Sequence, residues 1–170
     1  MGFVDPFHNK YQTGGLQHLL AKQVREEVGK DRFDSFFKFA VVRNPFDRLV
    51  SQFAYMKSRP DLRSFINLPE NSSFSEYLRL IRCKRHVQWE PQCSFLYDDR
   101  DVLLMDRIVR FESLDRDLQQ VFARLGVTLS DLPHHLATER GPYRAYYSDS
   151  DRVTVESMYG DDLVRLGYAF

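Results

Sequence analysis

The stretch FFKFAVVRNPFDRLVSQF constrains the fold more than any other part of the sequence. Residues 36–42 are aromatic and β-branched, which is typical of a short buried strand. Asn44 and Pro45 follow directly and suit the N-cap and the first position of a helix, so a helix is expected over residues 44–57. The chain is therefore predicted to pass from a strand into a helix at Arg43.

Helical spacing and turn residues divide the rest of the chain. Helices are expected over residues 16–29, 73–84, 113–126 and most of 151–170, strand–turn–strand over 101–112, a loop over 58–73 and an irregular segment over 1–15. Strands that alternate with helices indicate an α/β fold, with a mostly parallel central sheet flanked by helices. The length of 170 residues fits a single domain over residues 1–170.

Composition excludes several classes of function. Lys and Arg together number 24, as do Asp and Glu, so the chain lacks the basic excess of a nucleic-acid or anionic-membrane surface. No apolar run reaches the roughly 20 residues of a membrane helix, and the first residues do not form a signal peptide. The histidines and acids lack metal-ligand spacing, so no metal is expected. Cys83 and Cys93 fit either a disulfide or two buried thiols.

The junction between the strand and the helix is suited to bind an anion. In open α/β sheets ligands lie beyond the carboxyl ends of strands, where a helix start presents free N–H groups and a positive dipole end. Arg43 at this place is predicted to bind phosphate or sulfate through its planar guanidinium, with Ser51 donating from the helix flank. The alternative is that Arg43 forms only a surface ion pair. Arg48 is predicted to pair with an acid, either Asp47 or Glu112.

Four segments, in the same order along the chain, resemble segments of the carbohydrate sulfotransferases of the family-2 type. FKFAVVRNPFDRLVSQF is similar to the 3′-phosphate-binding motif of that family, Arg-Asn-Pro-x-x-Arg-x-x-Ser. The other segments are HVQWEPQCSFL (86–96), DRIVRFESLDRDLQQVFARLG (106–126) and YRAYYSDSDRVTVESMYGDDLVRLGYAF (143–170). The resemblance covers roughly residues 16 to 170.

The resemblance implies a fold, a donor and a reaction. It implies a P-loop-NTPase-like sulfotransferase fold, the donor 3′-phosphoadenosine 5′-phosphosulfate, and transfer of a sulfuryl group to a hydroxyl of a carbohydrate acceptor. Arg43 and Ser51 would hold the 3′-phosphate of the donor, and Tyr143 and Arg144 would belong to a segment that closes over the nucleotide.

Two histidines are candidates for the general base. His18 precedes the Arg43 strand in a region where related sulfotransferases place a histidine near the acceptor; its alternative is an inert, partly buried helix residue. His86 lies in the expected acceptor segment with Trp89, whose indole could stack on a sugar; its alternative is a surface-loop histidine. Glu112 is expected to be a structural partner of Arg48 or Arg110.

The sequence departs from the family at the 5′-phosphosulfate loop. No Pro-Lys-x-x-x-Thr-Ser turn follows an apolar strand, and Lys10 is only a weak substitute. The resemblance therefore implies an N-terminally shortened domain. The alternative function is an inactive or truncated domain that binds nucleotide or a partner without transfer. A P-loop kinase is disfavoured because no Walker lysine is present.

The expected compartment depends on the source of the protein. It is the cytoplasm for a bacterial protein and the Golgi lumen for a eukaryotic fragment. The oligomeric state is left open.

Overall fold

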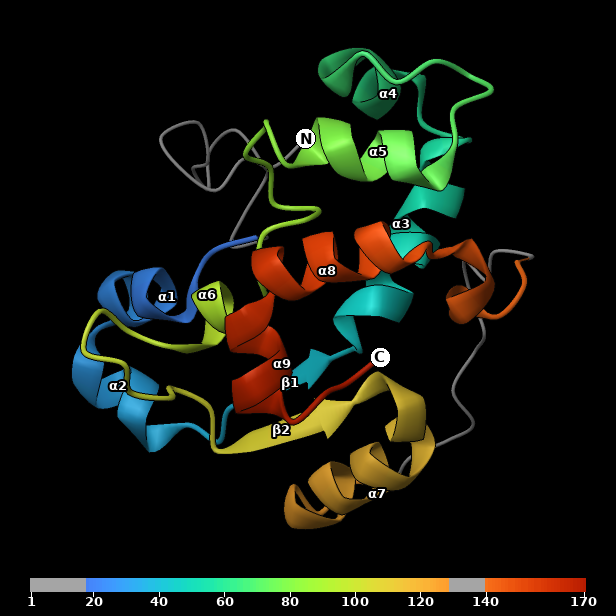
Figure 1. Cartoon of the computed structure of the whole chain (residues 1–170). Coiled ribbons are helices and arrows are strands. Elements are labelled where there is room, and N and C mark those ends of the chain that lie inside the picture. The colour runs from blue at the N-terminus through green and yellow to red at the C-terminus, as the bar shows by residue number, and fades with distance from the viewer. Residues whose placement is uncertain (1–17, 129–139) are drawn as a thin grey trace. The chain divides into compact units, whose positions relative to one another are not determined.

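The computed structural model describes residues 18–128 and 140–170, and its helices and strands are shown in Figure 1. The chain separates into two compact units. Among the described residues, unit 1 comprises His18, 44–91 and 140–170, and unit 2 comprises 19–43 and 92–128. The chain passes from unit 2 to unit 1 at the Arg43–Asn44 peptide bond and back to unit 2 after Pro91. The expectation of a single domain over 1–170 stays a prediction.

Unit 2 contains a small parallel sheet. Strand β1 (Phe39–Val42) pairs with β2 (Arg107–Arg110), and Val42 lies opposite Arg110 in the register. The helices of this unit are α1 (Ala21–Val28), α2 (Lys30–Ser35), α6 (Cys93–Leu96), η1 (Phe111–Ser113) and α7 (Leu114–Arg124). Val109 of β2 packs on Leu118 and Val121 of α7, which forms the buried seam between sheet and helix.

All regular elements in the described part of unit 1 are helices. They are α3 (Pro45–Met56), α4 (Pro60–Ile66), α5 (Phe74–Ile81), η2 (Tyr143–Tyr146), α8 (Asp149–Met158) and α9 (Gly160–Leu166). One core cluster connects these helices through buried side chains that include Phe46, Leu49, Tyr77, Val155 and Tyr159. Together the two units form a mixed α/β chain with a small parallel sheet, which agrees with the predicted α/β class. The larger central sheet flanked by helices stays a prediction.

Several predicted elements are wrong in detail. The stretch expected to be a loop contains α4, because Pro60 suits the first helical position and Leu62 and Ile66 bury one face of the turn. Only one strand, β2, forms in residues 101–112; Leu103 makes an isolated antiparallel bridge with Tyr97 instead.

Helix boundaries also differ at both ends of the chain. The first described helix begins at Ala21, after the start expected for it at residue 16, and ends before Gly29, whose φ of 86° favours glycine. The last expected helix is two helices, α8 and α9, divided at Tyr159, whose φ of −124° and ψ of 26° interrupt the helical path.

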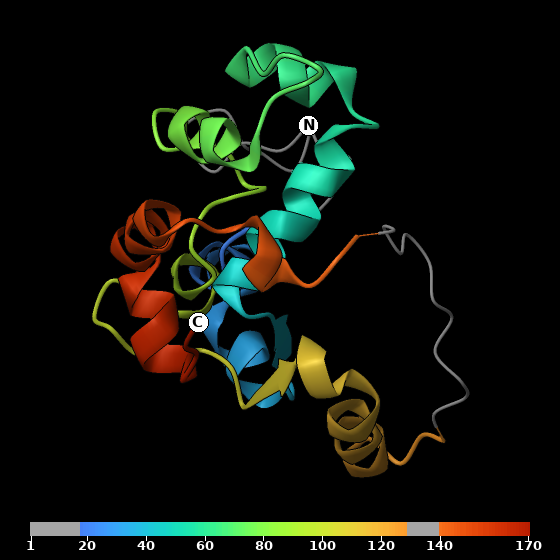
Figure 2. The ribbon, with the colours of Figure 1, turned by 45° about the vertical axis from the view of Figure 1, so that its right-hand side comes forward.

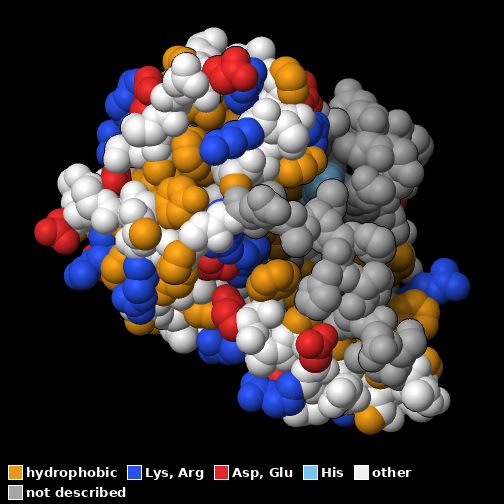
Figure 3. All heavy atoms as spheres, turned by 90° about the vertical axis from the view of Figure 1, so that its right-hand side faces the viewer, with side chains coloured by type: hydrophobic (Ala, Val, Ile, Leu, Met, Phe, Trp, Pro, Cys, Tyr) orange, Lys and Arg blue, Asp and Glu red, His pale blue; other side chains and the backbone are white. Residues whose placement is uncertain are grey.

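Charged side chains of both signs are interspersed on the face of the molecule in Figure 3. In the described part of the chain no helix is long and apolar enough to cross a membrane. Cys83 is exposed and Cys93 is buried, and both are thiols.

Candidate functional site

Arg43 lies directly after β1, at the edge of the unit 2 sheet where both parallel strands end. Its main chain is fixed by the Gln92 amide: Arg43 N–H donates to Gln92 Oε1, and Gln92 Nε2 donates to the Arg43 carbonyl, each at 2.8 Å. The Arg43 guanidinium carbon lies 4.3 Å from the centroid of the Phe111 ring, which follows β2. Main chain and side chain of Arg43 are therefore both held within unit 2.

This arrangement suits an anion-binding arginine. A guanidinium that stacks on an aromatic face keeps its N–H donors in the plane of the fork, where they can bind two oxygens of a phosphate. The sequence predicted the role of Arg43 but not that of Gln92 or Phe111. Gln92 and Phe111 stand in recognisable sequence runs, Pro-Gln and Arg-Phe-Glu. Their contact with Arg43 could not be predicted, because Gln92 lies 49 positions and Phe111 lies 68 positions after Arg43 in the chain.

The start of α3, in unit 1, has the predicted cap. Asn44 Oδ1 accepts the Phe46 N–H at 3.0 Å, and Pro45 occupies the first helical position. Asn44 also donates from Nδ2 to the Ala169 carbonyl at 2.9 Å. The cap residue therefore ties the first turn of α3 to the segment that follows α9, which no local sequence pattern indicates.

A second segment, η2 with its flanking residues, covers the same turn of α3 (Figure 2). Tyr147 Oη donates to the Phe46 carbonyl at 2.9 Å, and Arg140 pairs with Asp47 at 2.6 Å. Within η2, Tyr143 is half-buried and Arg144 is exposed. The structure thus brings Tyr143 and Arg144 to the α3 start inside unit 1.

Unit 1 also contains Ser51, predicted to bind the donor, and His18, predicted to act as the base. Ser51 is half-buried on α3, almost two turns after Pro45. His18 is exposed, and its backbone is left-handed with φ of 64°. His18 precedes α1 and is exposed, so the interpretation of it as a partly buried helix residue is wrong, while its role in the chemistry stays a prediction.

His86 is fully buried, with an exposed fraction of 0%. Its ring stacks on Trp89 at 4.8 Å, and its Nδ1 accepts the Gln88 N–H at 3.2 Å. Burial lowers the pKa of His86 to about 4. Direct contact with an acceptor is disfavoured by this burial, and so is the interpretation of His86 as a surface-loop histidine.

Trp89 belongs to the core rather than to an open sugar-binding face. It is 4% exposed, and its Nε1 donates to the Lys84 carbonyl at 2.6 Å. Both indole faces are inside unit 1, because Trp89 is a member of the main core cluster. The suggestion that its indole stacks on a sugar is therefore not supported.

Arg48 has different partners from those predicted. Its guanidinium donates to the main-chain carbonyls of Glu90 at 2.8 Å and Gln88 at 3.2 Å, while Asp47 pairs with Arg140. Arg48 therefore holds the segment before Pro91 against α3. Its structural role was predicted correctly, but the partner type, an acid, was wrong.

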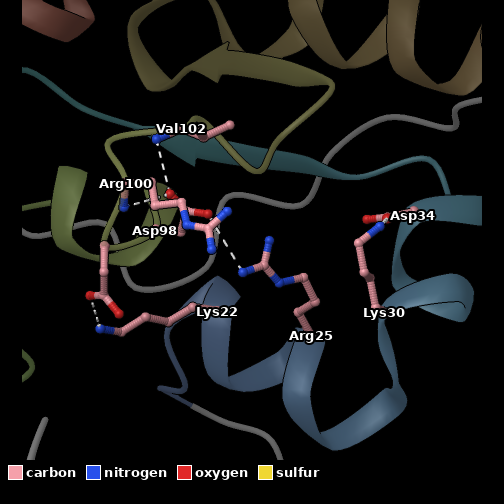
Figure 4. A network of polar contacts seen from close by, with 8 residues as sticks. Lys22, Arg25, Lys30, Asp34, Asp98, Arg100 and Val102 are labelled. Atoms are coloured by element: carbon pink, nitrogen blue, oxygen red, sulfur yellow. Dashed lines mark hydrogen bonds and ion pairs between the residues drawn. The ribbon is translucent and has the colours of Figure 1, made fainter.

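A separate polar network in unit 2 borders a depression of about 450 Å³ (Figure 4). Lys22 pairs with Asp99 at 2.6 Å and Arg25 with Asp98 at 3.5 Å. Asp98 also accepts the N–H groups of Arg100 and Val102, each at 3.0 Å, and these bonds lower its pKa. Since its cations are largely paired with carboxylates, this network ties α1 to the 98–102 turn and leaves little net charge for a ligand.

Within residues 18–128 and 140–170, no group of three or more His, Cys, Asp or Glu side chains is placed to hold a metal ion. Lys10, the weak substitute for the lysine of the 5′-phosphosulfate loop, lies outside the described residues.

Comparison with known proteins gives a family and one distant relative. The profile of the family described as "Sulfotransferase family" matches residues 5–169 of the chain. An uncharacterized protein of Archaeoglobus fulgidus is 28% identical over 109 residues, which are 64% of this chain and 83% of that protein. No solved structure shows a significant match.

Proposed function

The chain belongs to the sulfotransferase family, and from this premise we propose that it transfers a sulfuryl group from 3′-phosphoadenosine 5′-phosphosulfate to a hydroxyl of a carbohydrate. The observation that carries the proposal is the family match over residues 5–169, joined to the fixed position of Arg43 at the strand end. The fold that goes with it is of the P-loop-like sulfotransferase type, with β1 and β2 as part of its parallel sheet.

The donor's 3′-phosphate fits the residues present. It carries negative charge and needs several donors, which Arg43, Ser51, Arg144 and the first N–H groups of α3 can supply. Tyr143 is suited to line the nucleotide beside Arg144.

The reaction needs a base and a leaving-group donor. The acceptor oxygen attacks sulfur in line, the bond between sulfur and the 5′-phosphate oxygen breaks, and adenosine 3′,5′-bisphosphate leaves. The hydroxyl proton passes to a base, for which exposed His18 is the better candidate than buried His86.

A second function is favoured by one feature of the sequence. The 170 residues contain no Pro-Lys-x-x-x-Thr-Ser motif, which in this family stabilises the leaving phosphate oxygen. The alternative is therefore a domain that binds the nucleotide, or a partner, without transfer.

Isothermal titration with adenosine 3′,5′-bisphosphate tests the binding site. We expect Arg43→Ala to weaken binding by about ten- to a hundredfold, because charge-assisted hydrogen bonds contribute about 1.5–3 kcal/mol. Arg107→Ala is the matched control, since Arg107 lies at the opposite end of β2 and bonds Gln120, and it should leave affinity unchanged.

A transfer assay with sulfate-labelled donor on a panel of glycans separates the two functions. Transfer that is lost in Arg43→Ala supports the enzyme, and His18→Ala should then lower the rate of transfer more than bisphosphate affinity. Binding without transfer supports the alternative. Failure to bind, or binding that Arg43→Ala does not alter, overturns the site.

A further inference from the structure

Phe170 contacts both the first turn of α3 and the side chain of Arg144. We propose that it is a positioning residue, which orients the Arg144 guanidinium toward the donor's 3′-phosphate. This inference rests on the proposed function, since it concerns the same nucleotide site, and it involves contacts inside unit 1 alone.

The first set of contacts joins Phe170 to α3. Its ring meets the buried Phe46 ring edge to face, with 4.9 Å between centroids. The preceding residue is held as well, because the Ala169 carbonyl accepts from Asn44 Nδ2 at 2.9 Å. Tyr147, which bonds the Phe46 carbonyl, packs on Phe170 at 5.4 Å. Phe170 is therefore fixed with respect to the N–H groups at the start of α3.

The second set of contacts joins Phe170 to Arg144. The guanidinium carbon of Arg144 lies 4.8 Å from the Phe170 centroid and 5.4 Å from the Tyr143 centroid. Tyr143 and Phe170 in turn meet edge to face at 5.8 Å. Two rings thus support one exposed guanidinium.

The charge of Arg144 is available to an anion. No carboxylate among the described residues forms an ion pair with it. Arg152 differs: it also lies over Phe170, at 5.5 Å, but it pairs with Glu156 at 3.1 Å. A guanidinium that lies over a ring can keep its N–H edge toward solvent, and that edge can bind a phosphate through two hydrogen bonds. The ligand expected here is a phosphate monoester.

The test is a double-mutant cycle on bisphosphate affinity, measured by isothermal titration. Phe170→Leu removes the aromatic face and should weaken binding about three- to tenfold, the range expected for a cation–π contact. Phe170→Tyr keeps the ring and should stay within about twofold of the wild type. In an Arg144→Ala background, Phe170→Leu should change affinity by less than about twofold, because its effect passes through Arg144.

Two further variants keep the test decisive. Phe65→Leu removes another ring of unit 1 that carries a cation, Lys84 at 5.5 Å, and should lower the melting temperature without changing affinity. Arg144→Lys keeps the charge but loses the planar stack, so it should lose about as much affinity as Phe170→Leu; it also serves if Phe170→Leu does not fold.

The outcomes distinguish the proposed function from the positioning role of Phe170. A wild-type chain that binds no bisphosphate overturns the proposed function and this role together. If the wild type binds and Arg43→Ala weakens binding, the proposed site stands. The positioning role alone is then overturned by any of three results: unchanged affinity in Phe170→Leu or Arg144→Lys, a loss that persists in the Arg144→Ala background, or an equal loss in Phe65→Leu.

Discussion

Two buried tyrosines of unit 1 differ in one hydrogen bond. Tyr77 and Tyr159 are both in the main core cluster, with exposed fractions of 0% and 1%. The Tyr159 hydroxyl donates to the Trp89 carbonyl at 2.5 Å, whereas the Tyr77 hydroxyl has no hydrogen-bond partner among the described residues. Burying a polar group without a hydrogen-bond partner lowers the stability of the folded state, and removing that group recovers the lost free energy.

The pair gives a prediction for stability in urea. Tyr77→Phe should leave the free energy of unfolding unchanged or raise it by up to about 1 kcal/mol, because it removes an unpaired hydroxyl. Tyr159→Phe should lower the same quantity by about 1–2 kcal/mol, because the Trp89 carbonyl loses its donor. Equal destabilisation in the two variants would contradict this account of Tyr77.

His86 predicts a pH dependence. Its folded-state pKa of about 4 lies below the ordinary value of 6.5, so the unfolded chain binds the proton more tightly. Stability is therefore complete above pH 6.5 and is lost as the pH falls from there toward 4. Between pH 7 and pH 5 this one group should lower the free energy of unfolding by about 2 kcal/mol.

Urea titrations at pH 7 and pH 5 measure that change. His86→Asn keeps an acceptor for the Gln88 N–H but does not titrate, so most of the difference between the two pH values should vanish. His18→Asn is the matched control and should keep the wild-type difference. The buried carboxylates with lowered pKa, such as Asp117 and Asp151, lose their contribution at lower pH, near and below their ordinary value of 3.8.

At the level of elements, α3 shows how local chemistry can define a helix start. Asn44, Pro45 and the apolar positions after them act through neighbours in the sequence, so the cap could be predicted and is confirmed. Ser73 caps α5 in the same way by accepting the Glu76 N–H at 3.2 Å. Short-range rules succeed wherever both partners lie within one turn.

Other elements depart from local rules because a distant or competing partner decides them. Ser113 occupies the N-cap position of α7 without capping it, because its hydroxyl donates to Asp117, which also accepts the Arg110 N–H. The turn η1 then precedes α7 in place of a capped start. In α4, burial of Leu62 and Ile66 outweighs the turn formers that predicted a loop.

At the scale of the whole molecule, the two units differ in the size of their cores. Unit 1 has one large cluster of buried side chains that joins α3, α5 and α8. Unit 2 has smaller clusters, one of them formed by Ala21, Phe33 and Leu104. Amides protected by a large core open only with the global transition, whereas those above small clusters open locally.

Hydrogen exchange should reveal this difference. We expect the slowest-exchanging amides in α3, α5 and α8 and faster exchange in α1 and α2, measured by mass spectrometry on the native chain. Val50→Ala, in the unit 1 core, should speed exchange in α5 and α8 as well as in α3. Uniform protection across both units would contradict the expectation.

Local sequence patterns predicted the strand before Arg43, the capped start of α3, the α/β class and the family resemblance. These features depend on residue types at short, regular spacing, where each interaction is local. Long-range packing, in contrast, buries His86 and Trp89, sets Gln92 against the main chain of Arg43, and brings Phe170 into contact with both α3 and Arg144. The reason is physical: burial and packing depend on contacts between residues far apart in the chain, which no short pattern specifies.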